Sequence, residues 1–231
     1  MKFFHPTEPI FRRKQEALDV QDLEGLFHLR FKIQGKTLIS VLYTRIDQVF
    51  VLWGLISATI FFTAQFAPIS WVTQAIFWSI LSAVGCIGMI VLTHFWVKIE
   101  QLRWLLYSWV ALMLVGAIVT DLGIFLSWGW VLTNLCNLWL VLSAVGYICT
   151  GVGMQSRAFL LAAIAHLAAI AILPYVGGYQ FLATGIAMTA TLLIFAETQW
   201  DMRPPLKNND RLTLEQRQFN EEQCKLRQLS I

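Results

Sequence analysis

Six apolar stretches dominate this chain, and each is long enough to cross a membrane as a helix. The hydrocarbon core of a bilayer is about 30 Å thick and needs about 20 apolar helical residues. Of the 231 residues, 57% are apolar and 13% are charged, which excludes a disordered chain and most soluble classes. We therefore expect an all-α polytopic membrane protein with six transmembrane helices in a domain of residues 49–200. Their expected bounds are 49–67, 71–97, 104–126, 128–150, 158–176 and 179–200.

The basic residues predict how these helices are oriented. Of the 17 Lys and Arg residues, eight precede the first apolar stretch, six follow the last, and three lie in the second and fourth loops. Basic residues in short loops stay on the cytoplasmic side, so we expect both termini in the cytoplasm. The pattern favours contact with membrane lipid over binding of nucleic acid. It is typical of a bacterial-type plasma membrane or of an organelle membrane of bacterial descent.

The regions on either side of the six stretches are too polar to insert. In the basic N-terminal region, residues 1–48, apolar and polar residues alternate over 27–33 and a Gln-Gly-Lys turn follows, which predicts a small hairpin. We expect a helix from about residue 37, and an interfacial helix throughout is the alternative. In the tail, residues 201–231, the sequence Thr-Leu-Glu-Gln has capping-box spacing and predicts a helix over 213–229.

Polar residues inside the apolar stretches are the candidates for a site, because hydrocarbon does not tolerate an unpaired polar group. Asp121 and Asn134 lie at similar depths in the outer half of the third and fourth stretches. Asn137 lies one turn deeper, and His166 lies near the middle of the fifth. We expect these four residues to form a substrate-binding pocket, in which Asp121 carries the charge and His166 accepts a proton or contacts the ligand. The alternative is that Asp121 reaches the interface and the others hold helices together.

A second pair of ionisable residues lies near the cytoplasmic ends of the helices. His94 in the second stretch and Glu197 in the sixth would together suit a gate or a point where protons enter, and separately they would be interfacial residues. The four cysteines form no CxxC pair, and the sequence contains no nucleophile elbow, zinc-protease motif or phosphate-binding loop. We therefore expect no metal, no cofactor and no catalytic residue.

Two functions from different classes fit these observations. The first is a small-solute or proton-coupled transporter, permease-like, with its polar pocket in the outer half of the bundle. The second is a non-catalytic accessory, assembly or scaffold subunit of a larger membrane complex, whose partners would be other membrane protein subunits. An enzyme acting on lipid is a third alternative, for which His94 and Glu197 offer the only acid and base near a headgroup.

Overall fold

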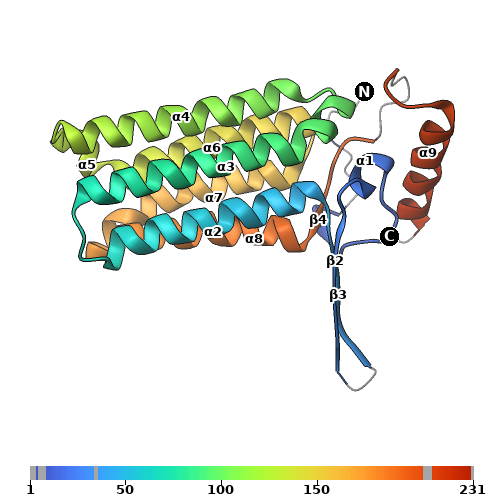
Figure 1. The fold of residues 1–231 in the computed structure, drawn as a ribbon, viewed down its shortest axis with the longest axis horizontal. Coiled ribbons are helices and arrows are strands. Elements are labelled where there is room, and N and C mark those ends of the chain that lie inside the picture. The colour runs from blue at the N-terminus through green and yellow to red at the C-terminus, as the bar shows by residue number, and fades with distance from the viewer. Residues whose placement is uncertain (1–3, 5–8, 34–35, 205–209, 230–231) are drawn as a thin grey trace.

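The fold is a bundle of long helices with both ends of the chain gathered at one end (Figure 1). The computed structural model describes residues 4, 9–33, 36–204 and 210–229, and most of these residues are helical. Six helices are long and apolar enough to cross a membrane. They are α2 (Arg45–Phe66), α3 (Trp71–Ile99), α4 (Arg103–Phe125), α6 (Leu135–Met154), α7 (Arg157–Ile172) and α8 (Gln180–Glu197).

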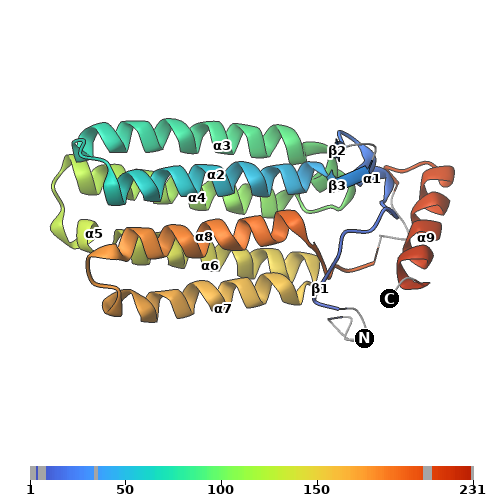
Figure 2. The ribbon, with the colours of Figure 1, turned by 90° about the horizontal axis from the view of Figure 1, so that it is seen from below.

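The six helices form a closed ring. Helix α2 packs against α3 on one side and α8 on the other, α4 joins α3 to α6, and α7 lies between α6 and α8 (Figures 1 and 2). Large apolar side chains cover the outside of the ring, and Leu55, Ile87 and Val91 are 61%, 64% and 65% exposed. An apolar outer surface of this extent suits hydrocarbon and not water.

The fourth expected span, 128–150, differs from a single helix. A short helix, α5 (Gly129–Thr133), is followed by a break at Asn134, and α6 then continues to Met154. The Asn134 side chain donates from Nδ2 to the carbonyl of Trp130, at 2.9 Å, and its φ of −115° is not helical. Asparagine competes for backbone hydrogen bonds in this way and so interrupts a helix. Two 3-10 turns, η1 (Leu173–Tyr175) and η2 (Gly177–Tyr179), join α7 to α8.

Short strands add to the helical fold, and one pair of them lies where the sequence predicted a small hairpin over 27–33. Strands β2 (Phe27–Ile33) and β3 (Lys36–Tyr43) form an antiparallel hairpin, so the helix expected from about residue 37 is wrong. Helix α2 begins only at Arg45, because Thr44 and Asp47 form a capping box at its start. A second small sheet pairs β1 (Phe11–Arg12) with β4 (Gln199–Trp200).

Two further helices lie outside the ring, beside its end (Figure 1). They are α1 (Val20–Leu23) and α9 (Leu214–Leu229), and α9 occupies the region where the tail helix was expected. The pairing of β1 with β4 ties the segment before the ring to the segment after it. The two terminal regions therefore meet on the same end of the bundle.

The interior of the ring near that end is aromatic. Phe159 and Phe195 stack with ring centroids 4.3 Å apart, and Phe50 and Tyr147 pack around them. Further along the interface of α4 and α6, the indole of Trp109 lies against Gly146 and donates to the hydroxyl of Thr150. The absence of a side chain at Gly146 is what lets this ring approach the neighbouring backbone.

We expect Gly146→Ala to destabilise the bundle by about 1–3 kcal/mol, because the added methyl group would overlap a rigid, hydrogen-bonded ring. An added Cβ at Gly146 would lie 2.4 Å from the nearest atom of Trp109. The matched control is Gly129→Ala, where an added Cβ meets nothing within 4 Å. Thermal unfolding of the two purified variants in detergent measures the difference, and equal melting temperatures would contradict this packing.

Candidate functional site

The residues flanking the ring assemble into a single polar structure across its end. We call residues 11–24 together with α9 the terminal cap. Arg227 donates to both carboxylate oxygens of Asp19, at 2.9 and 3.1 Å. Asn220 donates to the side chain of Gln21 at 3.1 Å and accepts from the backbone N–H of Val20 at 2.8 Å. These contacts join residues about 200 positions apart in the sequence.

The terminal cap is fastened to the ends of the ring helices. Gln21 donates to Glu100, at the end of α3, at 2.8 Å, and the indole N–H of Trp96 donates to Asp22 at 3.0 Å. Arg203 forms an ion pair with Glu100, at 3.6 Å. Glu100 is 2% exposed, so this carboxyl links the cap, α3 and the segment after α8 inside the protein.

A second buried carboxylate fixes the segment after α8 to the start of α7. Asp201 accepts from the backbone N–H groups of Arg157 and Ala158, both at 3.0 Å, and from the hydroxyl of Ser156 at 2.9 Å. Its side chain also pairs with the Arg157 guanidinium at 2.8 Å. An acidic group at a helix N-terminus satisfies N–H groups that have no partner in the helix. This contact closes the ring on the side of the cap.

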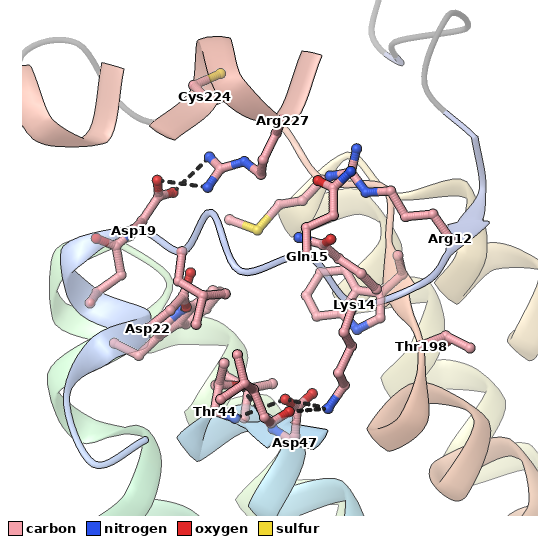
Figure 3. Close-up of a pocket in the computed structure, with 18 of the residues that line it drawn as sticks. Arg12, Lys14, Gln15, Asp19, Asp22, Thr44, Asp47, Thr198, Cys224 and Arg227 are labelled. Carbon is pink, nitrogen blue, oxygen red and sulfur yellow. Dashed lines mark hydrogen bonds and ion pairs between the residues drawn. The ribbon is translucent and has the colours of Figure 1, made fainter. Parts of the chain in front are cut away.

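A cavity of about 130 Å³ lies beneath the terminal cap and is lined by charged side chains (Figure 3). Its acidic and basic groups are largely matched in pairs, among them Lys14 with Asp47 at 2.8 Å and Arg227 with Asp19. Figure 3 shows both pairs on the cavity wall. Because the charges balance, the cavity suits a polar group that forms hydrogen bonds and has no net charge.

An apolar cavity of about 110 Å³ lies inside the ring, next to the charged one. Ile46 and Trp96 line both cavities and form the boundary between them. Each of the six ring helices contributes to the apolar wall, with Ser57, Thr93, Met113, Ser143, Phe159 and Met188 as examples. The ring N–H of Trp53, also on this wall, is buried and has no hydrogen-bond partner among the described residues.

A third, smaller cavity of about 30 Å³ lies at the far end of the ring and contains Asp121. The hydroxyl of Ser79 donates to Asp121 at 2.7 Å. Trp139 donates to the hydroxyl of Thr120 at 3.2 Å on the same wall. The cavity has room for about two water molecules.

Of the four expected pocket residues, only Asp121 lines the cavity at the far end of the ring. The residues that line the cavity of Asp121 include neither asparagine nor His166. Asn137 instead donates to Asn134 at 3.1 Å, within one helix turn. His166 is 1% exposed and hydrogen-bonds through Nδ1 to the carbonyl of Ala162 at 2.8 Å, and its Nε2 has no partner among the described residues.

The two residues expected at a gate, His94 and Glu197, have different surroundings. Glu197 accepts a hydrogen bond of 2.5 Å from the hydroxyl of Tyr43, at the base of the hairpin, rather than one from His94. His94 is exposed on the outside of α3. The described residues contain no group of three His, Cys, Asp or Glu side chains that could hold a metal ion.

Burial controls the charge of the carboxyl groups under the cap. Burial and the nearby Asp19 carboxylate raise the pKa of Asp22 to about 7, and the Trp96 hydrogen bond opposes this only in part. Burial also raises the pKa of Glu100 above its ordinary value, more than Arg203 lowers it. The pKa of Asp19 is likewise raised by burial despite its pairing with Arg227. The closed cap therefore takes up protons more readily than the unfolded chain.

Sequence reasoning missed this capped end as a candidate site. The stretch from Arg12 to Glu24 was treated only as part of the basic N-terminal region, and the segment 213–229 was predicted only as a helix, with no site assigned to either. The one sequence signal that could have pointed to a buried role is that both segments contain a few apolar residues between their charged ones. Comparison with protein-family models, curated proteins and solved structures finds no match to this chain. The candidate site therefore rests on the geometry alone.

We expect Asp22→Asn to stabilise the cap above neutral pH by on the order of 2 kcal/mol, because the amide still accepts from Trp96 and has no charge to bury. In the wild type, the raised pKa means that cap stability falls as the pH rises from about 4 to about 7 and then stays low. Hydrogen exchange of residues 11–24 at about pH 5 and about pH 8 measures this.

The matched control for this experiment is Glu16→Gln, which removes an exposed carboxyl from the same segment. Its hydrogen exchange should follow the wild-type dependence on pH. A wild-type cap that is equally protected at both pH values, or a loss of protection in Asp22→Asn at high pH, would contradict the assignment.

Proposed function

We propose that this protein is a small membrane carrier for an amphipathic molecule whose polar group has no net charge. The observation that carries this proposal is the order of the three cavities along the ring. Helix α2 contributes Ile46 to the charged cavity, Ser57 to the apolar one, and Ile60 and Ala64 to the one that contains Asp121. At 1.5 Å per residue, Ile46 and Ala64 are roughly 27 Å apart, close to the thickness of the hydrocarbon core.

The chemistry of the walls supports the kind of ligand. An apolar cavity of about 150 Å³ in another protein stays dry and binds benzene, so the 110 Å³ cavity suits a ring or a short branched chain. The unpartnered N–H of Trp53 offers one donor to such a ligand. Buried polar groups are nearly always hydrogen-bonded, so an acceptor atom on the ligand would complete this site. The charged cavity would receive the polar end.

Trp96 and Ile46 would act as the gate of this carrier at the capped end. Both lie between the two larger cavities, and Trp96 is held by its hydrogen bond to Asp22 of the cap. Release of that hydrogen bond would free the indole to turn away and join the cavities. Under the orientation predicted from the basic residues, this end faces the cytoplasm. At the opposite end, Asp121 with Ser79 would supply the ionisable group for proton coupling.

An accessory subunit of a larger complex remains the second candidate, and it is favoured by one observation. Helix α9 exposes Leu214 and Leu226, which are 70% and 52% exposed on the outside of the cap. A partner subunit that binds along α9 would cover these two leucines. Mass spectrometry of the protein in mild detergent separates the two functions, because a carrier retains a small molecule and an accessory subunit retains a protein of defined mass.

We expect Ser57→Leu to abolish retention of the small molecule, because a leucine side chain would fill part of the apolar cavity. The matched control is Thr59→Leu on the same helix, where the residue is exposed outside the ring. Native mass spectrometry of wild type and both variants should show an adduct that only Ser57→Leu loses. No adduct on the wild type, or equal adducts on all three proteins, would contradict the proposed carrier.

A further inference from the structure

The hairpin formed by β2 and β3 extends away from the rest of the molecule. It leaves the bundle sideways, across the direction of the helices, instead of folding back onto the cap (Figure 1). Beyond its base, only the two strands pair with each other. A two-stranded hairpin alone in water is marginally stable, so a surface beside it would contribute to its stability.

The base of the hairpin fixes its level relative to the ring. Strand β3 ends at Tyr43, two residues before α2 begins at Arg45. Gln48, in the first turns of α2, donates to the carbonyl of Gly25 at 2.9 Å, and Arg45 pairs with Glu24 at 3.3 Å. The hairpin is therefore attached where an apolar helix starts, which in a bilayer is the level of the headgroups.

The strand register makes the hairpin amphipathic. Paired residues share a face of an antiparallel sheet, and successive residues alternate between faces. The pairs Phe27–Tyr43, Leu29–Val41 and Phe31–Ile39 place six apolar or aromatic residues on one face. The alternate positions of β2 are His28, Arg30 and Lys32. They pair with Leu42, Ser40 and, beyond a register shift after Phe31, Thr37.

The apolar face is open on strand β2 and is half-buried at Val41 and Tyr43 of strand β3. Phe27 and Leu29 are 56% and 44% exposed. Tyr43, on the same face, donates its hydroxyl to Glu197, the last residue of α8. The direction of Tyr43 places this face on the side of the spanning helices.

We propose that the hairpin lies on an anionic membrane surface and anchors the ring at the headgroup level. Its apolar face rests on the acyl chains, and Arg30 and Lys32 meet lipid phosphates. This matches how amphipathic segments bind interfaces, by apolar burial together with attraction to anionic lipid. Each basic residue near such a surface favours contact by about fivefold. The inference rests on the hairpin alone and does not depend on the proposed carrier function.

Spin labels on adjacent residues of opposite faces test this arrangement. Ile39→Cys and Ser40→Cys are labelled one at a time in the full chain with its four native cysteines replaced by alanine, and the protein is placed in nanodiscs containing phosphatidylglycerol. We expect the label at 39 to be more accessible to oxygen, which concentrates in lipid, and the label at 40 to be more accessible to a water-soluble nickel chelate. Adding Arg30→Gln and Lys32→Gln should increase the nickel accessibility at 39 by several fold.

Equal accessibility of both labels to the nickel chelate would overturn the proposal and would leave the hairpin as a surface for a protein partner. Hydrogen exchange of residues 27–43 in the unmodified chain provides a second measurement that needs no cysteine replacement. We expect these amides to exchange at least several-fold more slowly in phosphatidylglycerol nanodiscs than in phosphatidylcholine nanodiscs. Equal exchange in the two lipids would likewise overturn the proposal.

Discussion

The dominant constraint on this structure is that six helices are apolar enough to cross a membrane, where hydrocarbon would offer their backbones no hydrogen bonds. The backbone inside the bundle is satisfied by six long helices, and the buried carboxyl groups gather where the helices end. Glu100 and Asp201 are both at most 4% exposed, yet each accepts hydrogen bonds from a different part of the chain. These two carboxyls hold the terminal regions onto the ring. The same constraint leaves the middle of the ring apolar, with hydroxyl groups as its main polar lining.

The existence of the six helices could be predicted, because length and apolar composition are local properties of the sequence. Local structure at their borders could not be predicted with the same success. Residues 37–43 contain apolar residues at both strand and helix spacing, and the capping box at Thr44 and Asp47 decides that the helix starts after them. Asn134 lies in a run that is apolar on average, so the sequence alone does not show that its side chain interrupts the helix.

The candidate site was much less predictable than the fold. Depth in a helix can be calculated from the sequence, which is why Asp121 was correctly recognised as a polar residue within an apolar helix. Which side of a helix faces the interior of the ring cannot be calculated from the sequence without knowing the neighbouring helices. The expectation that His166 shares a pocket with Asp121 therefore rested on their similar depth and not on packing. The contacts between Asp19 and Arg227 depend on two terminal segments meeting, and no local pattern records such a meeting.

The pairing of α2 with α8 has a consequence for how the protein is made. The first of the six ring helices packs against the last, so the ring cannot close before α8 has been synthesised. At typical synthesis rates, α2 would wait roughly ten seconds for α8 to follow it into the bilayer. During that interval Gly54 and Ser57, which face the interior of the finished ring, would be exposed to lipid or to the insertion machinery. The order of synthesis thus makes ring closure, and the joining of the cap that follows it, the last steps of assembly.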